Sequence, residues 1–234
     1  MKKILIIGII ILSIFIIYLT TLDKKVYYLV LGDEISLGLT SNNHYEKNYS
    51  EYIKEYLEEK KLLEKYINEY VTQNYRITDI INDIKTNKEL EDTKQTLKNA
   101  LIKADLVTIS IGTNDIMSKI ETTNKMNKID YKKLKDNIES IKNDYEQLLK
   151  QLREYCKEDI IVIGIYINTN NEYIYEMIKN LNQQFKNISK NYNIEYIDLY
   201  ELLTSEEYVY PTKEDHIIIK ESVIGIINNN LLKK

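Results

Sequence analysis

The chain has 234 residues and a formal net charge of −4, with acidic and basic residues interspersed. A chain of this size supports one domain with a sizeable core, and its charge balance offers no basic field to attract nucleic acid. A single cysteine, Cys156, cannot form an intramolecular disulfide, and two histidines without cysteine pairs make no metal-binding motif. We therefore expect no metal, no cofactor and no nucleic-acid partner.

Residues 4–22 form an apolar segment of about the 20 residues that a membrane-spanning helix needs. No small-x-small cleavage site follows it, so residues 1–25 are predicted to be an uncleaved signal anchor. Two lysines and the amino terminus precede the segment, and the two lysines after it are partly offset by Asp23. The excess of positive charge before the segment predicts a cytoplasmic N-terminus at the cell membrane, with the domain of residues 26–234 outside the cytoplasm.

Beyond this anchor, apolar runs alternate with amphipathic segments. Five runs predict buried strands, at 26–31, 66–72, 106–111, 160–166 and 194–199. Apolar residues at helical spacing predict helices, at 49–57, 77–84, 97–104, 134–155, 174–188 and 217–232. The alternation predicts an α/β fold, a three-layer αβα sandwich in which helices cover both faces of a five-stranded parallel sheet.

Ligands bind to such sheets beyond the carboxyl ends of the strands, so the residues that follow the strands are candidates for the site. The first strand leads into Gly32-Asp33-Glu34-Ile35-Ser36, the third into Gly112-Thr113-Asn114-Asp115, and the fifth is followed by Pro211-Thr212-Lys213-Glu214-Asp215-His216. In order and spacing these segments resemble the SGNH (GDSL-type) hydrolases. The first sequence block of that family reads Gly-Asp-Ser, the third reads Gly-x-Asn-Asp and the last reads Asp-x-x-His, and the second block contains a glycine. The resemblance covers the chain from about Val26 onward and implies a flavodoxin-like sheet.

The resemblance implies acyl transfer, in which a serine attacks an ester and a histidine, oriented by an aspartate three residues earlier, takes its proton. An oxyanion hole is formed by the serine amide, a glycine amide and the third-block asparagine. Asn114, which follows Gly112 in the third block, matches that asparagine, and His216 matches the base. The second-block glycine falls near Asn74, and asparagine tolerates positive φ better than other non-glycine residues.

The sequence departs from the family pattern at three places. Glu34 stands at the nucleophile position and Lys213 at the aspartate position, and the Pro-x-x-x-Gly-Tyr pattern expected after the histidine is replaced after His216. Asp215, next to His216, is a candidate to orient the imidazole. Glu34 is a candidate general base with His216, and the alternative is a structural ion pair with His216 or Lys213.

Ser36 is a candidate for a shifted nucleophile. On a helix, however, two residues rotate the side chain by about 200°, and a first-turn hydroxyl at the start of the helix is the alternative role. We expect Gly32, Asp33 and Asp115 to hold the turns structurally. His44 lies in a polar loop and is expected to be solvated.

Together these features predict a membrane-anchored, extracytoplasmic relative of ester hydrolases whose catalytic machinery is impaired. One alternative is an active esterase on envelope lipids or O-acylated glycans that uses Ser36 or Glu34 with His216. The other is a non-catalytic module that keeps the cleft for an acylated lipid or glycan ligand or for a protein partner.

Overall fold

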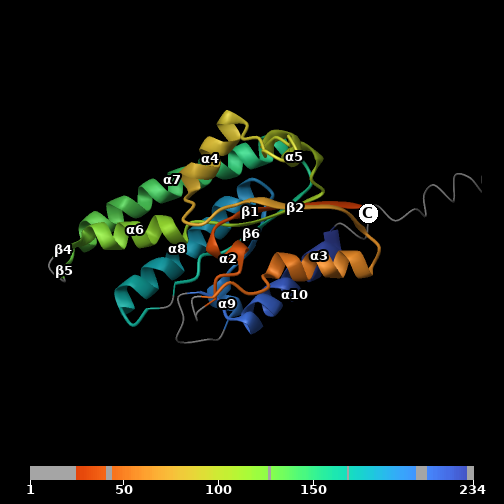
Figure 1. The fold of residues 1–234 in the computed structure, drawn as a ribbon. Helices are drawn as coiled ribbons and strands as arrows, with labels where there is room; N and C mark the ends of the chain where they lie inside the picture. Colours follow the sequence, from red (N-terminus) through yellow and green to blue (C-terminus); the bar gives the residue numbers. More distant parts are fainter. Residues whose placement is uncertain (1–24, 41–43, 126–127, 168, 204–209, 231–234) are drawn as a thin grey trace, which may run out of the picture.

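The computed structural model describes residues 25–40, 44–125, 128–167, 169–203 and 210–230. Its centre is a five-stranded parallel sheet, which confirms the predicted fold (Figure 1). From one edge to the other the strands are β2 (Leu63–Val71), β1 (Val26–Gly32), β3 (Leu106–Ser110), β6 (Asp159–Ile163) and β7 (Glu195–Ile197). A separate antiparallel pair, β4 (Asn124–Lys125) and β5 (Lys128–Ile129), was not predicted.

Helices cover both faces of the sheet (Figure 1). One apolar core packs under α4 (Ile77–Thr86), α5 (Leu97–Lys103), α6 (Thr113–Thr123), α7 (Tyr131–Tyr155) and α8 (Glu172–Asn191). The opposite core packs under α3 (Tyr49–Glu59) and α10 (Lys213–Asn230), near the short helices α2 (Glu34–Leu37) and α9 (Leu199–Leu202). Helix α6, which starts directly after the third-block glycine, was not predicted.

The continuous apolar run of β1 follows from this burial on both faces. Leu29 and Leu31 belong to the first core, whereas Tyr28 and Val30 belong to the second, and all four side chains are buried. Strand β2 begins three residues earlier than predicted. It lies at the edge of the sheet, where polar and exposed side chains interrupt the apolar pattern that would have marked its start.

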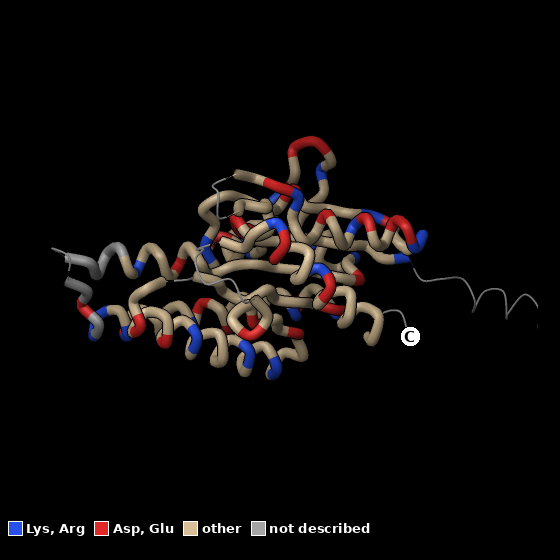
Figure 2. Tube along the Cα trace, turned by 90° about the horizontal axis from the view of Figure 1, so that it is seen from below, with Lys and Arg blue, Asp and Glu red and all other residues tan. Residues whose placement is uncertain are grey.

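The predicted anchor at residues 4–22 lies outside the described residues. Within the described part of the chain, no helix is both long enough and apolar enough to cross a membrane. Lys, Arg, Asp and Glu residues are interspersed along the helices (Figure 2). Because the strands are parallel, their carboxyl ends meet at one edge of the sheet, where the candidate residues of the first three blocks come together.

Candidate functional site

The turn after β1 depends on Gly32 and Asp33. Gly32 has a φ of +137°, and a Cβ there would lie 2.3 Å from the carbonyl oxygen of Ser110, so a larger residue would clash with backbone. Asp33 caps α2, since its Oδ1 accepts hydrogen bonds from the Ile35 amide at 3.3 Å and the Ser110 hydroxyl at 3.0 Å. These contacts fix the direction in which the next residue, Glu34, leaves the sheet.

The carboxylate of Glu34 is held by donors from two other blocks. Oε1 accepts the backbone N–H of Asn74 at 2.7 Å, and Oε2 accepts Nδ2 of Asn114, also at 2.7 Å. Asn114 Nδ2 also donates to the carbonyl of Tyr75 at 3.0 Å. The side chain of Glu34 is only 3% exposed. The structure thus brings Glu34, Asn74 and Asn114 into one hydrogen-bonded group.

N–H donors aimed at a single oxygen stabilise an oxyanion. Here the backbone N–H of Asn74 and Nδ2 of Asn114 bind the two oxygens of one carboxylate. Asn74 supplies its donor because it adopts a φ of +60°, the left-handed conformation expected at the second-block glycine position. Gly112, with a φ of +114°, provides the turn that starts α6 and places Asn114 at the sheet edge. The group that occupies these donors is Glu34, a side chain of the protein itself.

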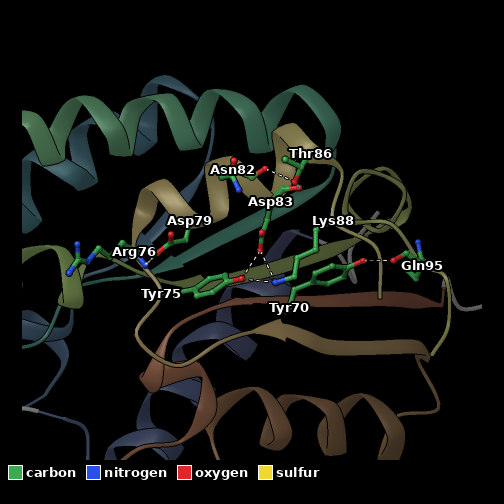
Figure 3. A network of polar contacts seen from close by, with 9 residues as sticks. All are labelled: Tyr70, Tyr75, Arg76, Asp79, Asn82, Asp83, Thr86, Lys88 and Gln95. Atoms are coloured by element: carbon green, nitrogen blue, oxygen red, sulfur yellow. Dashed lines mark hydrogen bonds and ion pairs between the residues drawn. The ribbon is translucent and has the colours of Figure 1, made fainter. Parts of the chain in front are cut away.

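Polar contacts of Tyr75, the residue after Asn74, hold this segment against α4 (Figure 3). The hydroxyl of Tyr75 donates to Asp83 Oδ2 at 2.9 Å, and Lys88 Nζ donates to the same hydroxyl at 2.5 Å and to Asp83 at 3.0 Å. Beyond the turn, Asp115 Oδ2 accepts the Ile77 amide at the start of α4 at 3.1 Å. The donor geometry therefore rests on α4 and α6 and not on a free loop.

Two other buried carboxyl groups follow the same strands, Asp33 before Glu34 and Asp115 after Asn114. Burial and the charge of Glu34 raise the pKa of Asp33 to about 8, and Oδ2 of Asp33 has no hydrogen-bond partner among the described residues. Burial raises the pKa of Asp115 to about 6. Despite this concentration of acids, the described residues contain no group of His, Cys, Asp and Glu side chains that could hold a metal ion.

Ser36 points away from this group into the core. Its hydroxyl donates to the carbonyl of Leu31 at 3.1 Å and lies 2.9 Å from the Tyr49 hydroxyl and 2.7 Å from the Ser110 hydroxyl. The residue is 2% exposed. The structure therefore does not bring the Ser36 hydroxyl to His216 or to the donors that hold Glu34.

His216 is also directed into the core. It lies in the first turn of α10, is fully buried, and stacks on Tyr49 with 6.3 Å between ring centroids. Neither ring nitrogen has a hydrogen-bond partner in the described structure, and burial lowers the pKa to about 4, against the opposing charge of Asp215.

The other candidates from this block serve the helix end or lie apart from Glu34. Asp215 Oδ2 accepts the amide of Thr212 at 2.8 Å, and its own amide donates to the Thr212 hydroxyl at 3.1 Å, which caps α10. Among the described residues, Glu34 forms no ion pair or hydrogen bond with His216 or Lys213. His44 is exposed.

Comparison with known proteins identifies the family of this chain. The model of the GDSL-like Lipase/Acylhydrolase family matches residues 30–216. The chain belongs to this GDSL-like family. No curated protein matches the sequence.

Solved structures with this fold include a catalytic mutant of an acetylxylan esterase from Geobacillus stearothermophilus. It is 16% identical with a TM-score of 0.61, and the match covers 88% of this chain and 95% of the esterase chain. A lipase from a goat rumen metagenome is 17% identical with a TM-score of 0.66, and the match covers 85% of this chain and 95% of the lipase. At these identities the likeness establishes the fold alone.

The Pro-x-x-x-Gly-Tyr pattern that the resemblance implies also offers a second register for the last block, which the sequence analysis did not consider. The Pro-x-x-x-Gly-Tyr pattern expected after the histidine begins at Pro211, if Asp215 and His216 occupy its last two positions. The residue before that proline is Tyr210, and Glu207, three positions earlier, falls at the aspartate position, outside the described residues. The proline was the signal that could have set this register.

The electrostatics of the site agree with this register. Burial and then the charges of Glu34 and Asp33 raise the pKa of Tyr210 to about 12, so its hydroxyl lies within the electrostatic reach of the nucleophile position. The charge that acts on His216 is that of Asp215. Tyr210 is therefore the residue of the described part of the last block whose pKa responds to the charge of Glu34.

Proposed function

We propose that this GDSL-like protein binds a ligand without hydrolysing esters. The observation that carries the proposal is the carboxylate of Glu34, which accepts both Asn74 N–H and Asn114 Nδ2 at 2.7 Å. An ester carbonyl would need these donors to stabilise the charge that develops on its oxygen. In this chain an internal anion holds them, and that anion is also the residue in the nucleophile position.

The groups around the donors are poorly suited to the two steps of acyl transfer. Attack by Glu34 on an ester would form a mixed anhydride, which is uphill from an ester. A general base works best with a pKa near the operating pH. Tyr210, with a pKa of about 12, stays protonated at neutral pH, and His216 is buried with a pKa of about 4.

The ligand class follows from the family and from the proposed anchor. Val26, the first residue of β1, comes four positions after the predicted anchor at 4–22, whereas Glu34 follows the other end of the strand. Seven strand residues span roughly 20 Å at about 3.3 Å per residue. With residues 4–22 in a bilayer, the site lies at the end of β1 that is farther along the chain from that bilayer. We therefore favour an acylated or plain glycan of the cell envelope over a lipid of the same membrane.

Hydrolysis of 4-nitrophenyl acetate by the full chain in a neutral detergent tests the proposal. We expect the parent protein to match the rate without protein. The double variant Glu34→Ser with Tyr210→His should hydrolyse the ester, because it regains a nucleophile and a base beside the retained donors. The same double variant with His216→Ala is the matched control and should keep that activity.

Activity of the parent protein would refute the proposal. Loss of that activity in Ser36→Ala, with folding retained, would favour an esterase with a shifted nucleophile. Loss in Glu34→Gln and in His216→Ala, but not in Ser36→Ala, would favour Glu34 as a general base.

A further inference from the structure

A hollow lies beside the Glu34 site, between α3 and the edge strand β2. Its volume is about 590 Å³, within the range of roughly 300–1,000 Å³ that is typical of small-molecule sites. It reaches Leu37, the last residue of α2, and Val71 at the carboxyl end of β2. Neither Asn74 nor Asn114 lines it, so it is an additional surface next to the family's site.

The charges around this hollow do not balance. Lys47 pairs with Glu55, and Lys54 lies 3.7 Å from Glu58. Two further glutamates line the hollow, Glu46 and Glu51. Glu51 accepts the amide of Asn48 through one oxygen and pairs with no lysine among the described residues. The hollow therefore has an excess of negative charge, which favours a positively charged ligand.

Tyrosine rings in and beside the hollow already accept ammonium groups. Lys47 Nζ lies 4.2 Å from the centre of the Tyr52 ring, and Lys54 Nζ lies 5.7 Å from the centre of Tyr66. An ammonium group over a tyrosine ring and next to a carboxylate is a favourable cation–π arrangement. Tyr45, next to Glu46, is 52% exposed, and no lysine of the described chain lies over its ring. Tyr45 and Glu46 both line the hollow and present a ring and a carboxyl group to an outside ammonium.

We propose that this hollow binds an extended oligosaccharide that carries free amino groups. Its ammonium groups would bind at Tyr45 with Glu46 and at Glu51, and the exposed amide of Asn68 would hydrogen-bond a sugar hydroxyl. The hollow continues to Ser36 and Leu37 of α2, the helix that begins at Glu34. The proposal rests on the binding role proposed above and adds the charge of the ligand.

A basic peptide fits this surface less well. A peptide in this position would add to the free edge of β2, as in strand addition. The pairing of β2 with β1 is shifted in register at two places, and exposed charged residues, Glu64, Lys65 and Glu69, lie along β2. Bulges and charges of this kind protect sheet edges from an additional strand.

Isothermal titration of the full chain in a neutral detergent tests the proposal with three hexamers of known charge. The probes are a glucosamine hexamer, its fully N-acetylated counterpart and hexalysine. We expect the glucosamine hexamer to bind at least tenfold more tightly than either of the others, with an affinity that falls as salt is raised. Glu46→Gln and Tyr45→Ala should each weaken its binding at least threefold. Glu139→Gln, the same charge change on α7 at the opposite face, should not weaken it.

Equal affinity for the acetylated hexamer would overturn the role of the amino groups. Equal affinity for hexalysine would show that charge alone decides and would overturn the sugar assignment. Absence of binding, or binding that Glu46→Gln and Tyr45→Ala leave unchanged, would overturn the site itself. None of these results changes the expected absence of ester hydrolysis, whereas hydrolysis by the parent would refute the proposed function and leave this titration valid.

Discussion

Replacing Glu34 by alanine should destabilise the fold, although it removes a buried charge. The carboxylate accepts two hydrogen bonds of 2.7 Å, from Asn74 N–H and Asn114 Nδ2. Hydrogen bonds to charged groups contribute about 1.5–3 kcal/mol each. Part of this loss is offset, because Asn114 keeps its bond to the Tyr75 carbonyl. We expect a net loss of about 2 kcal/mol, equivalent to about 4–8 °C in Tm for a chain of this size.

Glu34→Gln should recover little of the stability that Glu34→Ala loses. Its amide has nearly the shape of the carboxylate, but only one of its two terminal atoms accepts a hydrogen bond. With the oxygen toward the Asn74 amide, the NH₂ group would face Nδ2 of Asn114, a second donor. Rotation of the Asn114 amide would relieve this conflict only by breaking the bond to Tyr75. Glu34→Gln should therefore resemble Glu34→Ala in thermal unfolding.

Acetate should restore stability to the alanine variant, because it can occupy the donors that the side chain leaves. With a Kd of about 10 mM, 100 mM acetate would return about 1.4 kcal/mol. The parent protein and Glu46→Ala should gain nothing from acetate beyond the effect of equal chloride. The reasoning would be refuted by an alanine variant as stable as the parent, or by acetate that stabilises all three proteins alike.

Three further changes test the surroundings of the site. Between pH 6.5 and 8 the folded state keeps a proton on Asp33 that the unfolded chain has lost, so stability should fall as pH rises, by up to about 1.4 kcal/mol per unit. In Asp33→Asn, denaturant titrations at the two pH values should show a smaller fall. Ser36→Ala should lose about 1–3 kcal/mol in the same titration, whereas Thr86→Ala, at an exposed hydroxyl, should lose less than about 0.5 kcal/mol. Tyr75→Phe breaks the contacts to α4 and Lys88, so the Asn74 amide should exchange its hydrogen faster with unchanged exchange in β6.

The inner strands of the sheet could be predicted from sequence because they are buried on both faces. Every residue of a run such as Val26–Leu31 is hydrophobic, because alternate side chains enter the two cores. The start of β2 and the helix α6 were not predicted. At the sheet edge one side of a strand is solvated, and in α6 polar residues of the third block occupy the first turn. The spacing of apolar residues therefore predicts an element least well where that element borders solvent or a functional site.

The backbone conformation of the site could be predicted from sequence better than the directions of its side chains. Asn74 was expected at a positive-φ turn, and its φ is +60°. The partner of Glu34 was not predicted, because spacing along a chain does not say which way a carboxylate points. His216 and Tyr210 are six positions apart in the last block, and both are ring side chains near the start of α10. Only the packing of His216 on Tyr49 distinguishes them.

In the register that starts at Pro211, the residues Glu34 and Tyr210 suit each other physically. A serine nucleophile needs a base beside it, and a histidine in that place titrates near neutral pH. A carboxylate held by two donors needs no proton transfer, and a neighbouring imidazole would form an ion pair and compete with the donors for it. A phenol adds no charge at neutral pH and leaves the bonds from Asn74 and Asn114 intact. Restoring one position alone should therefore fail: Glu34→Ser without Tyr210→His has no base, and Tyr210→His without Glu34→Ser has no nucleophile, so only the double variant should hydrolyse the aryl ester.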